Sequence, residues 1–202
     1  MNGLHAPHLY VLSSRVLLYK MITVAIQGYE ASFHDVAARQ LLGDDVSLIC
    51  CDTFLSVFTA VSEGRAEYGV VAVSNSIYGP IHDSVKLFDM HKVDIEAQTT
   101  VAVEQCLLTL PGAQLSDVHE VYSHPVALAQ CKTYLSAYLP NALPVSHADT
   151  AGAAKDVASW NDPTKAAIAS KAAAERYGLT VHAANIQSEK NNITTFVLFT
   201  RR

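Results

Sequence analysis

The chain has 202 residues, of which 50% are hydrophobic and 16% are charged, with a formal net charge of −5. This composition excludes a disordered chain and leaves ample length to bury a core. The negative charge, without any block of Lys and Arg, argues against nucleic acid or an anionic membrane as a partner. No apolar run of about 18 residues is present, so no membrane span is expected.

Cysteine and histidine usage gives no sign of a metal site. The four cysteines are Cys50, Cys51, Cys106 and Cys131, and no CxxC pair occurs. Cys50 and Cys51 on one strand would point to opposite faces. The spacing suits neither a zinc site nor a disulfide framework, and the nine histidines are scattered singly. Reduced thiols in the cytoplasm are the better interpretation, with no metal.

The first 20 residues are set apart from the rest. Their apolar patch is broken by two serines and an arginine, and no small-residue cleavage site follows, so a signal peptide is not expected. We expect an N-terminal extension over residues 1–20, either disordered or the product of a mis-assigned start codon. The folded domain then spans residues 21–202.

The first half of this domain alternates short apolar runs with amphipathic ones. Ser32 precedes the first helical pattern and Asp35 follows three positions later, which is a capping box with Asp in place of Glu. The patterns predict strands over 22–28, 46–51 and 68–76 and helices over 33–43 and 54–64.

The second half repeats the alternation. It predicts strands over 99–109, 119–123, 165–170 and 194–200 and helices over 125–139, 149–160 and 171–178. Strands that alternate with helices indicate a parallel, helix-covered sheet, whose binding sites lie beyond the carboxyl ends of the strands. Two such sheets with a cleft between them fit the length better than one large sheet.

Polar residues gather at several predicted strand ends. The turn 28–32 could bind an anion through backbone N–H groups or could simply be a tight, capped turn; it is not GxGxxG. The Ser74–Asn75–Ser76 run suits hydrogen bonding to a polar ligand or the start of a loop. His124, beside a helix cap, is more often structural than catalytic. Near the C-terminus, NNITTF places two hydroxyls at the mouth of a strand.

Three segments in order carry a resemblance to a known family. They are GRAEYGVVAVSNSIYG (64–79), VYSHPVALAQC (121–131) and AAERYGLTVHAANIQSEKNNITTFVLF (173–199), preceded by IQG-x-x-x-SFHD. Together they resemble the catalytic domain of prephenate dehydratases, over about residues 22–200. The resemblance implies a two-lobed α/β fold like that of type II periplasmic binding proteins. Each lobe would be a mainly parallel sheet covered by helices, with the active site in the interlobe cleft.

The resemblance also implies domain limits and a reaction. Lobe 1 would comprise about 21–97 plus 180–202 and lobe 2 about 98–179, without the ACT regulatory module that many relatives carry. The reaction removes water and CO₂ from prephenate to give phenylpyruvate, for phenylalanine biosynthesis, and requires no cofactor. The family commonly forms dimers, so a homodimer is an expectation without an identified interface.

Site residues follow from the family motifs. Thr194 takes the place of the threonine assigned to the departing hydroxyl. Asn75, Gln130 and Ser123 would position the substrate, and the turn with Gly28, Ser32 and Phe33 would bind a carboxylate. The predicted substrate-binding set is completed by Ser74, Ser76, Thr195 and Phe196.

The chain departs from the family at this site. Thr195 replaces a motif arginine, Ser74 a glutamate and Gln105 a histidine, and the glycine-rich turn has become Gly28-Tyr29-Glu30-Ala31-Ser32. Loss of the guanidinium predicts a weaker activity, while joint loss of Arg and Glu is charge-balanced if they pair in relatives. Two alternatives remain. One is a retuned lyase acting on arogenate or decarboxylating prephenate without aromatisation, and the other is a non-catalytic aromatic-acid-binding protein.

Overall fold

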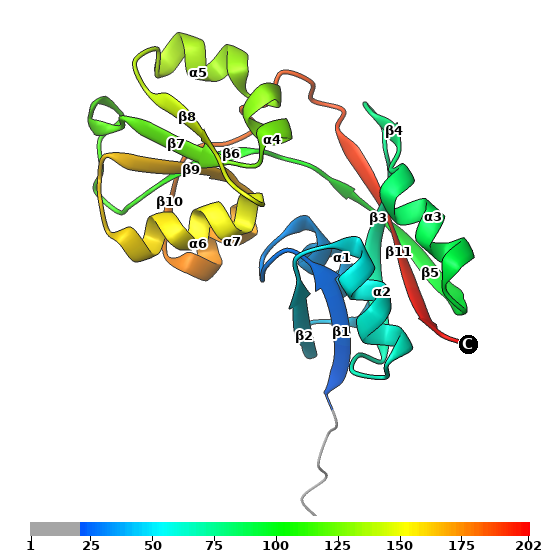
Figure 1. The fold of residues 1–202 in the computed structure, drawn as a ribbon. Helices are drawn as coiled ribbons and strands as arrows, with labels where there is room; N and C mark the ends of the chain where they lie inside the picture. Colours follow the sequence, from blue (N-terminus) through cyan, green and yellow to red (C-terminus); the bar gives the residue numbers. More distant parts are fainter. Residues whose placement is uncertain (1–20) are drawn as a thin grey trace, which may run out of the picture.

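The computed structural model describes residues 21–202, and the expectation for residues 1–20 lies outside this range. The chain forms two lobes, each a helix-covered mixed sheet (Figure 1). The two-lobed α/β architecture expected from the resemblance is confirmed, but the prediction that each sheet is mainly parallel is wrong, because antiparallel pairings are at least as frequent as parallel ones in both sheets. The cleft between the lobes is the place where the site is expected.

The first lobe is built on the strand order β2-β1-β3-β11-β5, with β4 beside β3. Its strands are β1 (Ile22–Gln27), β2 (Val46–Cys51), β3 (Tyr68–Asn75), β4 (Gly79–Pro80), β5 (Val93–Ala102) and β11 (Ile193–Arg201). Its helices are α1 (Phe33–Leu42), α2 (Phe54–Ser62) and α3 (His82–Met90). β1 runs parallel to β2 and β3, whereas β11 runs antiparallel to β3 and β5. Residues of α1 pack on one face of the sheet, and residues of α2 and α3 on the other.

The second lobe has the strand order β10-β6-β9-β7-β8. Its strands are β6 (Cys106–Thr109), β7 (Glu120–Ser123), β8 (Leu143–Ser146), β9 (Lys165–Ala169) and β10 (Thr180–Ala183). Its helices are α4 (Pro125–Gln130), α5 (Lys132–Tyr138), α6 (Thr150–Trp160) and α7 (Lys171–Tyr177), with a 3₁₀ turn, η1 (Leu115–Asp117). Residues of α6 and α7 pack on one face and residues of α4 and α5 on the other.

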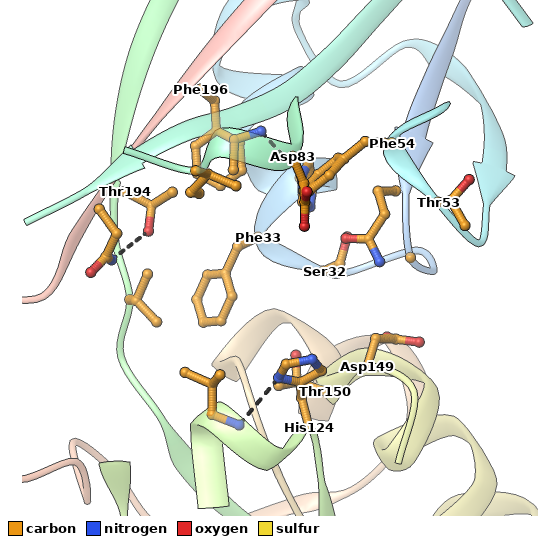
Figure 2. Close-up of a pocket in the computed structure, with 18 of the residues that line it drawn as sticks. Ser32, Phe33, Thr53, Phe54, Asp83, His124, Asp149, Thr150, Thr194 and Phe196 are labelled. Atoms are coloured by element: carbon orange, nitrogen blue, oxygen red, sulfur yellow. Dashed lines mark hydrogen bonds between the residues drawn. The ribbon is translucent and has the colours of Figure 1, made fainter. Parts of the chain in front are cut away.

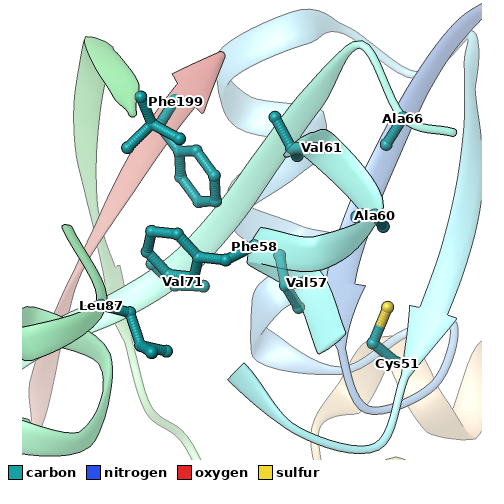
Figure 3. Packing of buried hydrophobic residues seen from close by; sticks show 11 residues of the cluster. Cys51, Val57, Phe58, Ala60, Val61, Ala66, Val71, Leu87 and Phe199 are labelled. Carbon is teal, nitrogen blue, oxygen red and sulfur yellow. The ribbon is translucent and has the colours of Figure 1, made fainter. Parts of the chain in front are cut away.

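The core of the first lobe shows why a glycine stands in β3. Phe199 of β11 lies directly opposite Gly69, and a Cβ on Gly69 would meet the Phe199 ring at 2.3 Å. The ring therefore lies flat over the backbone and stacks on Phe58 of α2, with centroids 4.3 Å apart (Figure 3). Buried aromatic surface of this kind stabilises the sheet on the face opposite α1.

Several predicted boundaries need correction. The single strand predicted over 99–109 is two strands in different lobes, β5 and β6, separated by residues 103–105. The helix predicted over 125–139 is divided at Cys131 into α4 and α5. Residues 98–102 belong to lobe 1, and residues 180–183 pair with β6 in lobe 2, opposite to the predicted assignment. The pattern also missed α3, β8 and β10.

The two crossings between the lobes lie side by side and form a hinge. The backbone N–H of Val103 donates to the carbonyl of Asn192 (2.7 Å), and that of Ile186 donates to the carbonyl of Gln105 (2.9 Å). The N–H of Gln105 donates to the side chain of Gln187 (3.0 Å). The hinge thus brings Val103, Gln105 and Asn192 to the lining of the cleft cavity.

Candidate active site

The interlobe cleft contains a cavity of about 980 Å³ lined by residues of both lobes. In Figure 2, Ser32, Phe33, Thr194 and Phe196 of lobe 1 face His124, Asp149 and Thr150 of lobe 2 across an open space. This is a volume typical of small-molecule sites. The geometry of the walls decides which polar atoms a ligand would meet.

A relay of hydrogen bonds organises the lobe 1 wall. The Asn75 Oδ1 accepts from the backbone N–H groups of Ile77 (2.9 Å) and Tyr78 (3.2 Å), which fixes the orientation of the amide. Its Nδ2 therefore faces the other way and donates to Thr194 Oγ (2.9 Å) and to Asn192 Oδ1 (2.7 Å). Because Thr194 accepts from Asn75, its own hydroxyl hydrogen is left without an acceptor among residues 21–202.

A bulge in β3 aims Asn75 at the cavity. Thr194 pairs with Asn75 and Thr195 with Ser74, but Phe196 pairs with Ala72, so β3 has one extra residue at this point. Without this residue, alternation along the strand would put Asn75 on the opposite face from Thr194. The bulge is therefore what allows the amide and the hydroxyl to meet.

The position of the missing motif arginine faces away from the cavity. Thr194 and Phe196 line the cavity and Thr195 between them does not, as expected for alternate residues of a strand. Ser74, in the place of the motif glutamate, lies directly opposite Thr195. The two departures are thus cross-strand neighbours, which agrees with the idea that the charges pair in relatives. Because neither Thr195 nor Ser74 lines the cavity, replacing the motif arginine and glutamate at these positions removes no charge from the cavity wall.

Two further serines of the predicted set are engaged elsewhere. Ser123 is fully buried and its hydroxyl donates to the carbonyl of Ile168 (2.6 Å), so it ties β7 to β9. The Ser76 hydroxyl donates to the carbonyl of Asn191 (2.8 Å) and accepts from the N–H of Ile193 (2.9 Å). Both hydroxyls hold backbone segments, and neither serine lines the cavity, so the structure gives no support to the prediction that they contact the substrate.

Three backbone N–H groups of the turn at residues 28–32 already have acceptors in the protein. Gly28 donates to the carbonyl of Cys51 (2.8 Å), Ala31 to the Asp35 carboxylate (2.7 Å) and Ser32 to the carbonyl of Tyr29 (3.1 Å). The predicted capping is present, since the Ser32 hydroxyl accepts from the N–H of Asp35. A carboxylate site made of these N–H groups is therefore not available, although Gly28, Ser32 and Phe33 line the cavity.

The same turn fastens lobe 1 to lobe 2. The carbonyl of Ala31 accepts from the Ser170 hydroxyl (2.8 Å), and that of Glu30 accepts from the Tyr177 hydroxyl (2.9 Å). Glu30 gives the turn a negative charge, which is compensated by an ion pair with Arg176. Burial, together with Glu30, raises the pKa of Tyr177 to about 12, which keeps this phenol a donor.

The lobe 2 wall is less tightly bonded. Gln105 is 3% exposed, its Nε2 donates to Gln130 Oε1 over 3.4 Å, and its Oε1 has no partner among the described residues. His124 caps α4 by accepting from the N–H of Val126 (3.3 Å), and burial lowers its pKa. His124 therefore has the structural role expected and also lines the cavity.

A second histidine, His34, lies in the lobe 1 wall. Its Nε2 accepts from the N–H of Ala72 (3.3 Å), and its ring meets Phe196 edge-on with centroids 5.0 Å apart. Burial lowers the pKa of His34 to about 4, so the ring is neutral at physiological pH. It supplies packing and an acceptor for the backbone of β3, and no positive charge.

The charged residues of the cavity are mostly acidic. Asp52, Asp83 and Asp149 line it, with Lys86 as the one cation among the residues of the described range that do so. Lys86 pairs with Asp83 at 2.7 Å. Asp149 is committed to the N-cap of α6, where its carboxylate accepts from the N–H of Gly152 (2.7 Å). A ligand in the cavity therefore meets three carboxylates and one ammonium in addition to the neutral donors beside Thr194.

Neither a metal centre nor a membrane span is visible in residues 21–202. No group of three or more His, Cys, Asp or Glu side chains in this range is placed to hold a metal ion. None of the helices described is long and apolar enough to cross a bilayer. The four cysteines are free, and Cys51 is buried while Cys50 is exposed, as predicted from their adjacent places on one strand.

The sequence predicted part of the cavity lining and missed other residues of it, among them one that is bonded to Asn75. Of the predicted site residues, those that line the cavity are Gly28, Ser32, Phe33, Asn75, Gln130, Thr194 and Phe196. Those that do not line it are Ser74, Ser76, Ser123 and Thr195. Asn192 was not in the predicted set, yet it lines the cavity and bonds to Asn75. Its position two residues before Thr194, where extended backbone would place it on the same face, was the signal that could have found it.

Sequence comparison relates the chain to a known family of enzymes. A family model described as prephenate dehydratase matches residues 24–202. The chain is 37% identical over 180 residues to an arogenate dehydratase of Petunia hybrida, which covers 89% of the chain and 42% of the relative. It is 35% identical to a bifunctional N-acyl-homoserine lactone acylase/prephenate dehydratase of Komagataeibacter europaeus, over 89% of the chain and 63% of the relative. It thus spans about half the length of such relatives.

A solved structure gives the same result. Prephenate dehydratase from Arthrobacter aurescens, solved in complex with L-Phe, superposes with a TM-score of 0.81 at 28% identity. The superposition covers 90% of this chain and 61% of that one. With the family model matched over nearly the whole domain, the chain belongs to the prephenate dehydratase family.

Proposed function

We propose that the protein catalyses the decarboxylative dehydration of prephenate to phenylpyruvate, the step that leads to phenylalanine. The observation that carries the proposal is the state of the Thr194 hydroxyl. Its oxygen accepts from Asn75, and its hydrogen is free to be donated into the cavity. A hydroxyl held in this way is a donor of fixed position, ready for an oxygen that gains negative charge.

The reaction needs little more than such a donor and good positioning. The bond between the ring and its carboxylate breaks, and its electron pair forms the new ring π bond while the ring hydroxyl departs. The prephenate dianion and one proton become phenylpyruvate, CO₂ and water. The hydrogen bond from Thr194 stabilises the charge that develops on the departing oxygen, and the aromatic ring supplies the driving force. Phe33 and Phe196 line the same cavity and offer apolar surface to that ring.

A matched pair of variants tests the proposal. Thr194→Val removes the hydroxyl with little change in shape, and Thr195→Val does the same to the next residue, on the opposite face of β11. We expect Thr194→Val to lower kcat with prephenate by about 100-fold, the effect of losing one transition-state donor. Thr195→Val should leave kcat within about threefold of the parent value, since a surface change of this kind is small. Formation of phenylpyruvate, followed by absorbance in alkali, is the measurement.

The outcomes separate the remaining readings. Full turnover by Thr194→Val would contradict the role given to this hydroxyl. Binding of prephenate without turnover by the parent protein would favour a non-catalytic binding protein. A decarboxylated product that is not aromatic would favour a retuned lyase.

Dehydration of arogenate is a second candidate, favoured by the charge of the cavity. Arogenate has an ammonium where prephenate has a keto group, and Asp52, Asp83 and Asp149 outnumber Lys86 around the cavity. Carboxylates near a bound ammonium favour it, whereas they oppose a dianion. The same preparation assayed with arogenate, with phenylalanine as the product measured, decides between the two substrates by their kcat/KM values.

The proposal extends to compartment and assembly. Four free cysteines, two of them in the core of lobe 2, suit a reducing cytoplasm. A homodimer is supported by the ten-residue edge strand β5, which pairs with β11 alone among the strands of residues 21–202 and exposes Ile95. Such an edge can pair with a second copy. Analytical ultracentrifugation gives the oligomeric state directly.

A further inference from the structure

Asn192 carries an unused donor at the edge of the cavity. The residue is 1% exposed and lines the cavity, and its Nδ2 has no partner among the described residues. Buried amide nitrogens are rarely left unpaired, because an unpaired buried donor costs about 1–3 kcal/mol. An orphaned donor on a cavity wall is therefore a position where a ligand atom is expected.

The orientation of the Asn192 amide is fixed by the backbone through Asn75. Two backbone N–H groups, from Ile77 and Tyr78, require the Asn75 oxygen, so the Asn75 nitrogen must face Asn192. Asn192 must then present its oxygen to that nitrogen, at 2.7 Å. A flipped Asn192 would oppose two NH₂ groups, so the free atom is the nitrogen.

The donor of Asn192 lies beside that of Thr194. Asn192 Oδ1 and Thr194 Oγ both accept from the same nitrogen of Asn75, and both residues face the cavity from one strand end. The carbonyl of Asn192 also accepts from Val103 in the hinge (2.7 Å), which holds the residue where the lobes meet. The wall thus offers two neutral donors next to each other, the Asn192 amide and the Thr194 hydroxyl. Hydrogen bonds to Asn75 and to the backbone of Val103 hold the segment that carries them.

We propose that Asn192 is a further substrate-binding residue, whose Nδ2 donates a hydrogen bond to an oxygen of the ligand next to the one that Thr194 contacts. This proposal rests on the proposed function for the identity of the ligand, a hydroxylated dicarboxylic acid. A neutral donor here suits a carboxylate or hydroxyl oxygen of the ligand, because the one lysine that lines the cavity, Lys86, is already paired with Asp83.

Two variants of Asn192 separate donation from a structural role. Asn192→Ala removes the donor and also the acceptor that Asn75 uses. Asn192→Asp keeps an acceptor for Asn75, removes the donor and adds a charge. If the donor matters, both variants lower kcat/KM about tenfold or more, the equivalent of one hydrogen bond to a charged group.

Other patterns would overturn the proposal. Loss with Asn192→Ala alone would mean that Asn192 only orients Asn75, and loss with Asn192→Asp alone would mean that the added charge is responsible. Parent activity in both variants would mean that the nitrogen meets no ligand.

Thr109 provides the matched control. Its hydroxyl is also buried and unpartnered, at 1% exposure, but it lies on β6 and does not line the cavity. Thr109→Val should leave kcat/KM within about twofold of the parent value, as for a substitution remote from the ligand. Suppose that Thr109→Val lowers kcat/KM as much as the Asn192 variants do. Removing a buried, unpartnered polar group anywhere in the protein would then lower activity, and the support for the proposal would be lost.

Titration calorimetry with prephenate keeps this test independent of catalysis. If the parent protein binds prephenate but does not convert it, the proposed function fails, while a weaker binding by both Asn192 variants still supports the donor. If the parent protein converts prephenate and both variants bind and convert it equally well, the proposed function stands and the role of Asn192 fails.

Discussion

The two walls of the cleft differ in how firmly their amide side chains are held. On the lobe 1 wall, backbone N–H groups fix Asn75, and Asn75 in turn fixes Thr194 and Asn192. On the lobe 2 wall, Gln105 and Gln130 share one long bond of 3.4 Å, and Gln105 Oε1 has no partner in the described range. One wall is an ordered row of donors, and the other leaves its amides free to adapt.

This difference suggests that the two lobes have different roles in the proposed reaction. A donor that must meet a developing charge acts best when its position is set before the substrate arrives, because no reorganisation is then needed. Side chains that only recognise a substrate can adjust when it binds. We therefore assign the chemistry to lobe 1 and recognition to lobe 2, and the following variants are expected to break or sharpen this distinction.

The largest effect is expected from Asn75→Asp. The carboxylate can still accept from the two N–H groups of Ile77 and Tyr78, but it cannot donate to Thr194 or Asn192. Two acceptors then face a negative charge, and the orientation of both donors is lost. We expect kcat to fall by about 100-fold, as for the loss of an oriented donor in the transition state. Steady-state kinetics with prephenate is the measurement.

The melting temperature of Asn75→Asp must be measured alongside its kcat. An unchanged melting temperature with a lower kcat would assign the effect to the relay, because it would leave the fold intact. A kcat within about threefold of the parent value would contradict a wall that is organised through Asn75.

A smaller effect, of a different kind, is expected on the other wall. Gln130→Leu removes an amide that lines the cavity and keeps a similar volume. Loss of one neutral hydrogen bond to the substrate predicts an increase in KM of about threefold to tenfold, with kcat nearly unchanged. If kcat fell as much as in Asn75→Asp, lobe 2 would share in the chemistry and the division between the walls would be wrong.

The fold and the position of the cleft were largely predictable from sequence. The alternation of apolar strands with capped helices indicated helix-covered sheets, and polar residues at strand ends indicated where a ligand would bind. The capping box at Ser32 and the opposite faces of Cys50 and Cys51 follow from local geometry alone, and the structure confirms both. Such features depend only on residues that are close together in the chain, so they can be predicted from the sequence.

What could not be predicted depends on the partner strand. Residues 99–109 form an unbroken β-rich run, and periodicity does not tell that it leaves one sheet at Ala102 and enters another at Cys106. The bulge that turns Asn75 toward Thr194 is a property of the pairing between β3 and β11. Ser123 has the right motif, yet its hydroxyl is used by Ile168, a residue 45 positions away. Each of these facts needs a three-dimensional neighbour.

The smallest effect is expected at the positions of the missing motif charges, Thr195 and Ser74. Thr195→Arg restores the motif guanidinium, and Ser74→Glu restores its cross-strand partner. Both side chains point to the face of the sheet away from the cavity, so neither variant, alone or combined, should change kcat/KM by more than about twofold. The combined variant should gain about 0.2–1 kcal/mol of stability from the new pair, measured as a coupling free energy in a double-mutant cycle.

A rise of about tenfold in kcat/KM with Thr195→Arg alone would contradict this expectation, since it would require the guanidinium to reach a substrate carboxylate. Because Thr194 and Asn192 already supply donors from the cavity side, the expected result is that the two charges stabilise the sheet beneath the site. Their absence would then leave the donor wall, and with it the activity, intact.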